Sequence, residues 1–508
     1  MAGLIHPSSL ERWQEWQSTR NRARQVKHAV TSAVRSRRGT QQLPGLVLHS
    51  REGEGDTRLL IGLDSASPTS RASLLTSLPY LRIGVDVLSP AGLDVPELAA
   101  LEVDDEARRE ALARVAVVKL NGGLGTSMGM AGPKAALIAR DGQTFLDVIV
   151  RQLIALEERF GARPPLVLLN SFRTRERSLE ILERYPQMAD QALPLDFLQN
   201  MEPKLDAETL APVEWVKNPS LEWCPPGHGD LYTALLGSGA LDHLLEAGYK
   251  YASVSNGDNL GAVPDGRLAG WFATSGAPYA AELCRRTIND KKGGHLAIRK
   301  SDDQLILRDT AQTAAEEMDY FTDEHRHPFF HTNNLWFDLE ALKKVLDERH
   351  GVMGLQIIRN EKTVDPKDSS STPVIQIESA MGGAIEVFEG ATCICVDRSR
   401  FLPVKTTNEL LLLRSDVYDL DDSGHLVKTT HETCAVDLDK EFYKKVGDFV
   451  DRIPEPPSLR RATSLNVKGD WTFGSGVVVE GDASLATEKP LTIPDGTVLT
   501  GDIPGETK

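Results

Sequence analysis

The sequence contains no long uncharged hydrophobic run. No part of its 508 residues approaches the roughly 18 uncharged apolar residues that a membrane-spanning helix needs. The N-terminus also lacks the charged segment followed by an apolar segment that marks a secretory signal. We therefore expect a cytoplasmic protein with no membrane partner. Its length is too great for one ordinary core and predicts two or three domains.

Cysteine is also scarce. The chain has five cysteines, Cys224, Cys284, Cys393, Cys395 and Cys434. Their odd number and scattered positions argue against a disulfide framework and predict reduced thiols. Cys393 and Cys395 have the spacing of half a zinc site, but "ATCICVD" alternates like a β-strand and no second ligand pair accompanies it. Ordinary strand packing is the better interpretation.

Positive charge is in deficit. The chain has 57 basic and 73 acidic side chains, which gives a formal charge of -16. This balance argues against broad binding to nucleic acid, which is itself a polyanion. The one basic stretch, residues 20–38, fits the solvated face of an N-terminal helix better than a nucleic-acid or targeting segment. Any anionic substrate must therefore be held by local charges.

The order of the segments predicts an α/β protein. After a mainly helical region at residues 1–105, short apolar runs alternate with helix-like segments through residues 106–418. Strands separated by crossover helices imply a mixed, mostly parallel sheet, which binds ligands at the carboxyl ends of its strands. Residues 419–508 differ in character. Apolar residues recur there every six positions, which is typical of a hexapeptide β-helix, with a twisted antiparallel sheet as the alternative. The recurring residues are Val467, Phe473, Val479, Leu485 and Leu491.

A glycine-rich stretch, "LNGGLGTSMGMAGPK", follows the apolar run "VAVVKL". Its glycines are one residue too widely spaced for the dinucleotide fingerprint, and its lysine follows proline, unlike the lysine of a P-loop. A loop without Cβ atoms still allows the backbone to approach a ligand and to present N–H donors to phosphate or base. Lys134, just beyond the glycines, places a positive charge there. A purely structural turn remains the alternative.

The exact form of this loop resembles the signature of the eukaryotic-type UTP–glucose-1-phosphate uridylyltransferases, also called UDP-glucose pyrophosphorylases. Seven further motifs of that family follow in the same order: "FLQNMEPKL", "PPGHGDLY", "NGDNLG", "KKGGHL", "FHTNNLWF", "VIQIESAMGGAI" and "DRSRFLPVKTTNELLLLRSDVY". The resemblance spans roughly residues 115–418. It implies a GT-A-like, Rossmann-like nucleotidyltransferase domain followed by a left-handed β-helix. It also implies an enzyme that makes UDP-glucose and pyrophosphate from UTP and glucose 1-phosphate with Mg²⁺.

The resemblance implies roles for individual residues. Lys134 and Lys405 match the lysines that the family places on the nucleotide phosphates, and Asp258 matches its magnesium-binding aspartate. Solvated lysines and a strand-capping aspartate are the alternatives. Gln199 matches the residue that reads uracil, and His228 is interpreted as a phosphate ligand rather than a general acid. The implied UTP-binding residues are Leu120, Asn121, Gly122, Gly123, Lys134, Gln199, Gly227, Asp258 and Lys405. The implied sugar-phosphate-binding residues are Gly122, Gly123, His228, Asn256, Gly257, Asp258, Gly294, Asn333 and Asn334.

Three residues depart from the family pattern near the sugar. His331 stands where "FNTNNLW" has asparagine, Asp309 stands where glutamate is usual, and Gly257 is the middle residue of the "N-[SI]-D-N" motif. Glucose is therefore less firmly implied than UTP. A related pyrophosphorylase for other UDP-sugars or UDP-N-acetylhexosamines is the nearest alternative, and a non-catalytic scaffold with the same fold is a second. A dehydrogenase is disfavoured by the loop spacing. Homo-oligomers through the C-terminal domain are left open.

Overall fold

The computed structural model describes residues 87–88, 95–130, 132–189, 193–287, 290, 293–431 and 433–505. Most of the N-terminal region, including its basic stretch, lies outside the described residues. Within the described part, no helix is long and apolar enough to cross a membrane. All five cysteines are described, and each is buried and carries a free thiol.

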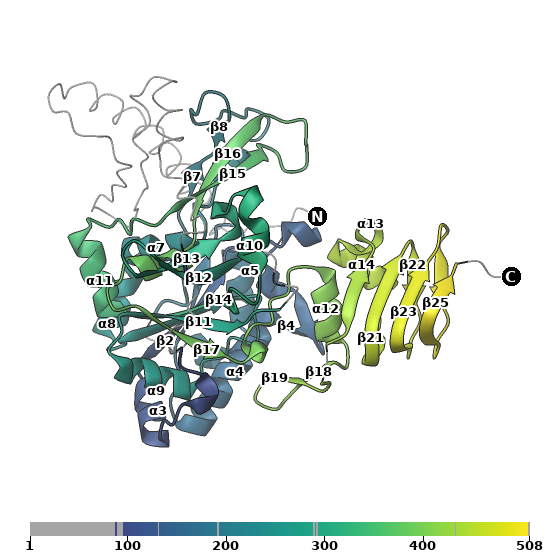
Figure 1. The fold of residues 1–508 in the computed structure, drawn as a ribbon, viewed down its shortest axis with the longest axis horizontal. Helices are drawn as coiled ribbons and strands as arrows, with labels where there is room; N and C mark the ends of the chain where they lie inside the picture. Colours follow the sequence, from purple (N-terminus) through teal and green to yellow (C-terminus); the bar gives the residue numbers. More distant parts are fainter. Residues whose placement is uncertain are drawn as a thin grey trace, which may run out of the picture.

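A seven-stranded sheet forms the centre of the molecule (Figure 1). Its strands in spatial order are β17 (Thr392–Val396), β11 (Tyr279–Arg285), β14 (Phe329–Asp338), β10 (Tyr251–Asn256), β2 (Val115–Asn121), β5 (Leu166–Asn170) and β6 (Asp196–Leu198). Only β14 runs antiparallel to its neighbours. The central strand β2 is buried along almost its whole length, which explains its continuous apolar sequence. The predicted mixed, mostly parallel sheet is confirmed.

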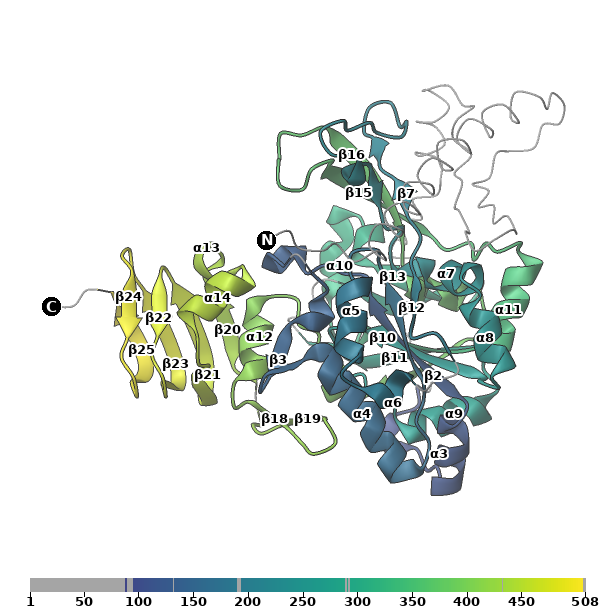
Figure 2. The same cartoon turned by 180° about the vertical axis from the view of Figure 1, so that it is seen from behind.

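Helices cover both faces of this sheet (Figures 1 and 2). The described α-helices are α3 (Asp105–Leu112), α4 (Phe145–Phe160), α5 (Arg175–Leu182), α6 (Pro186–Ala189), α7 (Leu231–Gly237), α8 (Ala240–Glu246), α9 (Gly266–Ser275), α10 (Met318–Thr322), α11 (Leu339–Glu348), α12 (Thr407–Arg414), α13 (Lys440–Tyr443) and α14 (Val446–Arg452). Of these, α13 and α14 lie beside the C-terminal strands instead (Figure 1). The ends of α4 show how the sequence sets such boundaries. Thr144 and Asp147 form a reciprocal capping box at its start, and Gly161, with φ of 67°, ends it.

Two hydrophobic cores follow from the alternation of side chains along β2. Val115 and Val117 face the core that α4 and α9 complete, and Ala116 and Val118 face the core that α7, α8 and α11 complete. The first core continues into the C-terminal region, so that region packs against the helical layer of the central sheet without a break in apolar contact.

Short sheets extend from this framework. They contain β1 (Val87–Leu88), β12 (Gly294–Arg299) and β13 (Gln304–Asp309); β15 (Ile357–Thr363), β16 (Pro373–Ser379) and β8 (Leu205–Asp206); β7 (Glu202–Pro203) and β9 (Trp223–Cys224); β3 (Ile138–Arg140) and β4 (Gln143–Thr144); and β18 (Tyr418–Leu420) and β19 (Leu426–Lys428). The β15–β16 hairpin projects from one end of the molecule (Figure 1). Its β16 strand leads directly to the carboxyl edge of the central sheet, where the candidate active site lies.

The C-terminal region is a stack of parallel strands that projects from one side (Figure 1). One sheet contains β20 (Ala435–Leu438), β21 (Ser458–Lys468), β23 (Val478–Ala486) and β25 (Val498–Pro504), and a second contains β22 (Trp471–Phe473) and β24 (Leu491–Ile493). Every strand pair in both sheets is parallel, so the antiparallel alternative is wrong.

The six-residue pattern marks the right side chains but not their pairing. Val467, Phe473, Val479 and Leu485 are all buried, as the pattern predicts. Val467 lies beside Leu485, but Phe473 lies beside Ile493 and Val479 beside Leu499. Leu491 is only partly buried and lies beside Trp471. Extra turn residues between the short strands therefore lengthen the repeat beyond a strict hexapeptide.

Candidate active site

The glycine-rich loop begins where β2 ends, at the carboxyl edge of the parallel strands. Gly125 and Gly129 have φ values of 59° and 71°, a left-handed conformation that favours glycine. The loop closes on itself when the backbone N–H of Lys134 donates to the carbonyl of Gly123 at 3.2 Å. β10 ends beside it at Asn256, so the segment that carries Asp258 leaves the sheet at the same edge.

Asp258 and the two predicted lysines form one cluster. The Nζ atoms of Lys134 and Lys405 both lie 2.9 Å from Oδ2 of Asp258. These residues come from three distant parts of the sequence, and the structure brings them together as the motifs imply. The side chains of Asp258 and Lys134 are largely buried, whereas that of Lys405 is 57% exposed. Lys405 is therefore the cation of the cluster that solvent and incoming ligands reach most easily.

The charge state of Asp258 follows from these contacts. Burial acts to raise the pKa of its carboxyl group, but the ammonium groups of Lys405 and Lys134 outweigh burial and lower it. Asp258 is therefore ionised at neutral pH. Its second oxygen, Oδ1, is buried and has no hydrogen-bond partner. A buried, unpaired carboxylate oxygen is unfavourable by itself and is well suited to a hard cation.

The protein supplies few other oxygen ligands for such a cation. Among the described residues, no group of three or more His, Cys, Asp or Glu side chains is placed to hold a metal ion. A Mg²⁺ ion at Oδ1 of Asp258 would take its remaining ligands from phosphate oxygens and water, as Mg²⁺ commonly does in phosphoryl-transfer sites. The donor set thus fits a metal that arrives with the nucleotide rather than a permanent protein cage.

Gln199 lies against the start of the glycine-rich loop. Its backbone N–H donates to the carbonyl of Asn170 at 2.8 Å, which places it just beyond the paired ends of β5 and β6. A Cβ atom at Gly122 would overlap the Gln199 amide, with the amide carbon only 2.9 Å away. Gly122 is therefore required for Gln199 to occupy this position. The hydroxyl of Ser171 donates to the carbonyl of Gly122 at 3.0 Å, which fixes the backbone at this point of the loop.

Asn121 and Leu120 have partners inside the sheet. The Asn121 amide donates to Oδ1 of Asn170 at 2.7 Å and to the Ser178 hydroxyl at 2.6 Å, and the residue is 4% exposed. The carbonyl of Leu120 accepts from the backbone N–H of Gly257 at 2.9 Å. The Asn121 amide thus points into the interior, and the predicted nucleotide contact of this residue, which falls to its backbone, stays a prediction.

His228 lies close to the Asp258 cluster. Its Nδ1 accepts a hydrogen bond from the backbone N–H of Met381 at 3.0 Å, which leaves the proton of the neutral ring on Nε2. Desolvation by the surrounding protein, reinforced by the charge of Lys405, lowers the pKa of His228 to about 4, although the residue keeps a solvent-exposed face. At neutral pH the ring is therefore an uncharged hydrogen-bond donor. The preceding Gly227 has φ of 81° and packs directly against the backbone of Ser379, at the end of β16.

Asp230, in the "PPGHGDLY" motif, connects two parts of the site. Its carboxylate accepts from the backbone N–H of Asn200 at 2.6 Å, from the Asn200 amide at 2.7 Å and from the Thr233 hydroxyl at 2.7 Å. It thereby ties the segment that carries Gln199 to the segment that carries His228. Sequence reasoning gave it no role, because no local signal distinguishes it from an ordinary helix-start aspartate.

Glu202 lies three residues after Gln199 and is almost completely buried. Burial, with smaller contributions from Glu378 and Asp230, raises its pKa from 4.5 to about 8, although the Ile377 N–H donates to it. Between these values the unfolded chain loses a proton that the folded protein keeps, so this group's contribution to stability falls as pH rises toward about 8. We expect Glu202→Gln to remove that loss.

The measurement is the thermal midpoint of both proteins from about pH 5 to about pH 8. The midpoint of Glu202→Gln should rise relative to wild type as pH increases, by an amount equivalent to roughly 1 kcal/mol or more. Parallel curves for the two proteins would show that Glu202 does not carry this proton.

Asn333 and Asn334 face opposite ways on β14. The Asn333 amide lies 3.4 Å from Oδ1 of Asn256, at the same edge as Asp258. Asn334 is 2% exposed, and its amide donates to Glu282 at 3.1 Å and accepts from Asn259 at 3.2 Å. The prediction that both asparagines bind sugar needs correction, because alternate residues of a strand point to opposite faces and only Asn333 points toward the edge.

Gly294 lies near His331 and Asp309, two of the residues that depart from the family pattern. A Cβ atom at Gly294 would meet Oδ2 of Asp309 at 3.3 Å and Leu307 at 2.8 Å, and Leu307 also borders Gly382 next to His331. Burial raises the pKa of Asp309, whereas burial and nearby His228 lower that of His331 to about 4. Gly294, Asp309 and His331 therefore form one side of the site. The Met381–Gly382 turn connects this side to His228.

A family model described as UTP–glucose-1-phosphate uridylyltransferase matches residues 86–480. The curated UTP–glucose-1-phosphate uridylyltransferase of Solanum tuberosum is 39% identical over 418 residues, covering 80% of this chain and 85% of the relative. That of Saccharomyces cerevisiae is 37% identical over 393 residues, covering 76% of this chain and 77% of the relative.

Solved structures agree with these sequence matches. A mutant UDP-glucose pyrophosphorylase from Leishmania major, in complex with UDP-glucose, is similar with a TM-score of 0.77 and 38% identity, covering 85% of this chain and 94% of that one. A Trypanosoma brucei protein titled UDP-glucose phosphorylase has a TM-score of 0.76 and 39% identity, covering 87% and 97%. The similarity thus extends over the central sheet and most of the rest of the chain.

Proposed function

The chain belongs to the UTP–glucose-1-phosphate uridylyltransferase family, and from that premise we propose how its own residues perform the reaction. It is a nucleotidyltransferase that makes UDP-glucose and pyrophosphate from UTP and glucose 1-phosphate. The observation that carries the residue-level proposal is the meeting of Lys134, Asp258 and Lys405 at the carboxyl edge of the sheet.

The reaction needs charge neutralisation and alignment more than acid–base chemistry. A phosphate oxygen of glucose 1-phosphate attacks the α-phosphorus of UTP in line, the bond to pyrophosphate breaks, and pyrophosphate leaves with the bonding electron pair. A phosphate monoester is already an ionised nucleophile, so no general base is required. The ammonium groups of Lys134 and Lys405 are placed to stabilise the charge that spreads over the phosphate oxygens. The reverse reaction follows the same path.

Mg²⁺ is proposed as the cofactor, held by Oδ1 of Asp258. When bound there, it would neutralise phosphate charge and orient the oxygens it contacts. The buried, unpartnered state of Oδ1 supports this proposal, and the two lysines on Oδ2 lower the pKa of the carboxyl group, which is therefore ionised at neutral pH. His228 is proposed to donate from Nε2 to a phosphate oxygen. It is unsuited to act as a general acid at neutral pH because its pKa lies near 4.

The base and sugar are proposed to bind on opposite sides of the Asp258 cluster. Gln199 and the backbone from Leu120 to Gly123 would read uracil. Asn256, Gly257, Gly294 and Asn333 would read the sugar hydroxyls. Gly227 would allow phosphate close to the backbone. Asn334 is assigned a supporting role only, for the reason given above.

Substitution of Gln199 tests the base assignment. Gln199→Ala should erode the preference for UTP over CTP and TTP by roughly 10-fold or more, because a site built to pair a donor and an acceptor discriminates strongly. Turnover at saturating UTP should change much less. The measurement is kcat/KM for each nucleoside triphosphate.

Glycine variants in the same loop provide a matched comparison. Gly122→Ala should reproduce the loss of selectivity because its Cβ displaces the Gln199 amide. Gly132→Ala, whose Cβ would meet nothing within 4 Å, should not. An unchanged UTP-to-CTP ratio in both Gln199→Ala and Gly122→Ala would remove Gln199 from the base site.

The overall activity is tested by pyrophosphate release from UTP, Mg²⁺ and a panel of sugar 1-phosphates. Glucose 1-phosphate should give the highest kcat/KM. A higher value for N-acetylglucosamine 1-phosphate would favour the related UDP-N-acetylhexosamine enzyme, and no release with any sugar phosphate would favour a scaffold. The family relationship supports the first outcome.

Three broader features are also proposed. The domain division at residues 106–418 and 419–508 is supported by the separate parallel stack at the C-terminus, and the parallel pairing supports a left-handed β-helix there. The outer strand β25, where Val498 is 52% exposed, is the surface proposed for self-association. A cytoplasmic location is consistent with five free, buried thiols.

A further inference from the structure

Four buried polar side chains lie directly next to the Asp258 cluster, and we call them the Glu282 network: Asn259, Glu282, Asn334 and Arg400. None is more than 9% exposed. Glu282, on β11, receives both Nε and Nη2 of Arg400 at 2.8 Å. It also accepts from Trp336 Nε1 at 2.9 Å and from the Asn334 amide at 3.1 Å. One carboxylate on β11 therefore holds groups from two other segments, β14 and the segment that contains Arg400.

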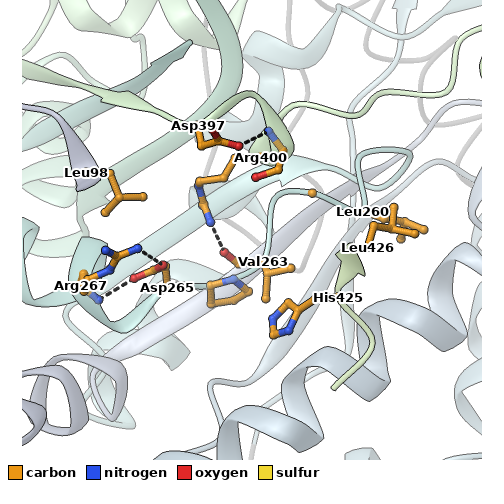
Figure 3. Close-up of a pocket in the computed structure, with 12 residues that line it drawn as sticks. Leu98, Leu260, Val263, Asp265, Arg267, Asp397, Arg400, His425 and Leu426 are labelled. Carbon is orange, nitrogen blue, oxygen red and sulfur yellow. Dashed lines mark hydrogen bonds and ion pairs between the residues drawn. The ribbon is translucent and has the colours of Figure 1, made fainter. Parts of the chain in front are cut away.

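Arg400 and Asn259 extend the network to the loops of the site. The carbonyl of Arg400 accepts from the Asn259 amide at 3.0 Å, and Oδ1 of Asn259 accepts from the backbone N–H of Leu402 at 2.9 Å. Nη1 of Arg400 donates to the carbonyl of Val263 at 2.8 Å, as Figure 3 shows. The segments that contain Asp258 and Lys405 are thus joined through hydrogen bonds that start from Arg400.

A cavity of about 280 Å³ borders Arg400 on the side of Val263 (Figure 3). It is lined by residues that include Leu260, Val263, Asp265 and Arg267. The loop after Asp258 borders this cavity, but Leu260 and Val263 themselves are only 2% and 7% exposed. Hydrogen bonds also fix the backbone of the loop: Arg400 donates to the carbonyl of Val263 at 2.8 Å, Lys119 to that of Ala262 at 2.8 Å and Gln152 to that of Leu260 at 3.0 Å.

Three of the four members of the network stand close in sequence to a proposed site residue. Asn259 follows Asp258, Asn334 follows Asn333, and Arg400 ends the short helix Arg398–Arg400, five residues before Lys405. The backbone N–H of Val404 donates to the carbonyl of Asp258 at 3.2 Å, so the two loops also contact directly.

This arrangement also holds the backbone conformation of Asn333 in place. Its φ of 64° is left-handed, which is unusual for a residue other than glycine and persists only where the surroundings fix it. The neighbouring Asn334 supplies such fixing through its buried hydrogen bonds to Glu282 and Asn259.

We propose that Glu282 is a positioning residue of the reaction, which sets the relative positions of Asp258, Lys405 and Asn333 through Arg400, Asn259 and Asn334. The proposal rests on the assignment of Asp258 and Lys405 to the reacting phosphates. Stability alone explains the ion pair poorly, because burying two charges costs about as much as their attraction returns. A bidentate carboxylate–guanidinium pair does supply a fixed geometry.

The charge state supports this role. Burial acts to raise the pKa of Glu282, but the charge and hydrogen bonds of Arg400 outweigh burial and lower it. The carboxylate is therefore ionised and holds both nitrogen donors of Arg400 at once. A neutral amide of the same shape, as in Glu282→Gln, would keep the volume and lose this paired contact.

The test measures kcat and KM for pyrophosphorolysis of UDP-glucose in Glu282→Gln, with the folded fraction determined by circular dichroism. Per folded molecule, kcat should fall on the order of 10- to 100-fold because the reacting groups are misaligned. KM should change less than about threefold, since Gln199 and the glycine-rich loop are untouched. The matched control is Asp470→Asn, which breaks a bidentate pair with Arg452 in the C-terminal region and should leave kcat unchanged.

A double-mutant cycle separates positioning from a merely structural role. If Glu282 acts through Lys405, adding Lys405→Ala should cost less in the Glu282→Gln protein than in the wild type. Full additivity, or a wild-type kcat per folded molecule in Glu282→Gln, would overturn the proposal. If Lys405→Ala alone had no effect, the site assignment itself would fail instead.

A milder variant keeps the test decisive if Glu282→Gln does not fold. Asn259→Ser removes the amide that joins Arg400 to Asn334 and leaves the buried ion pair in place. It should show the same loss in kcat with little change in KM. An active Asn259→Ser protein with wild-type kcat would also overturn the proposal.

Discussion

Replacement of both Lys134 and Lys405 by alanine is expected to lower kcat by several orders of magnitude and to leave the fold intact. Removing one positive group that stabilises transition-state charge typically costs on the order of 100- to 1,000-fold. Each lysine contacts the same oxygen of Asp258 at 2.9 Å. A single substitution leaves one cation beside Asp258, so each single variant should retain more activity than the double variant.

The double variant should also change Asp258 itself. Burial acts to raise the pKa of this carboxyl group, and only the two lysines oppose it strongly. Without them the carboxylate is expected to take up a proton closer to neutral pH, which weakens any metal site at Oδ1. The activity of the double variant should therefore fall more steeply on acidification than that of either single variant.

The measurement is kcat in both directions for the two single variants and the double variant. Lys343→Ala provides a matched control, because it removes a lysine that pairs with Asp242 at 3.2 Å on the helical surface, outside the site. Its kcat should equal that of the wild type. A folded Lys134→Ala, Lys405→Ala double variant with normal turnover would contradict the assignment of both lysines.

The sequence predicted the central sheet because its strands are buried on both faces. Such strands consist of continuous apolar residues, as in "VAVVKL" and "PPLVLLN", and they are separated by helix-like segments. The prediction that Lys134, Asp258 and Lys405 act together came from the resemblance of the motifs. The sequence around each lysine or around the aspartate does not indicate a partner that lies more than 100 residues away.

The motifs could not predict the direction in which individual side chains point. "HTNNLW" contains two adjacent asparagines, but only the strand's register decides that Asn333 points toward the edge and Asn334 into the interior. The side chain of Asn121 likewise points inward, where its amide donates to Asn170 and Ser178, so only its backbone is left for the predicted nucleotide contact.

Buried charges within strands were missed altogether. Lys119 lies inside β2, where its ammonium donates to the Ser255 hydroxyl at 2.7 Å and to the carbonyl of Ala262 at 2.8 Å. Glu282 lies inside β11 against Arg400. An isolated charge in an apolar run signals a buried partner, but the sequence does not say which residue that partner is.

The C-terminal stack shows how a repeat can be identified before its geometry is known. The six-residue spacing selected side chains that are indeed buried, because each short strand contributes an inward-facing apolar residue. The exact pairing depended on turn lengths between strands, for example around Gly474 and Gly476, and these lengths vary from one coil to the next.

Substitution of Asp258 by asparagine is expected to have the other large effect. The new amide would keep the shape of the side chain and lose the negative charge that binds the two lysines and that would bind the proposed Mg²⁺. Lys134 and Lys405 would then repel both each other and the metal. We expect kcat/KM to fall by about 100-fold or more at low Mg²⁺. Higher Mg²⁺ should recover part of the loss, because a weakened ligand first lowers occupancy of the metal site.

The central claim is that Asp258 is the metal-binding centre of the reaction, flanked by Lys134 and Lys405. The most direct test is a Mg²⁺ titration of UDP-glucose formation and of its pyrophosphorolysis in Asp258→Asn. The two directions share one transition state, so their kcat/KM values should decline by the same factor and recover together as Mg²⁺ increases. Wild-type rates in the variant, a loss with no dependence on Mg²⁺, or a loss in one direction only would contradict the account.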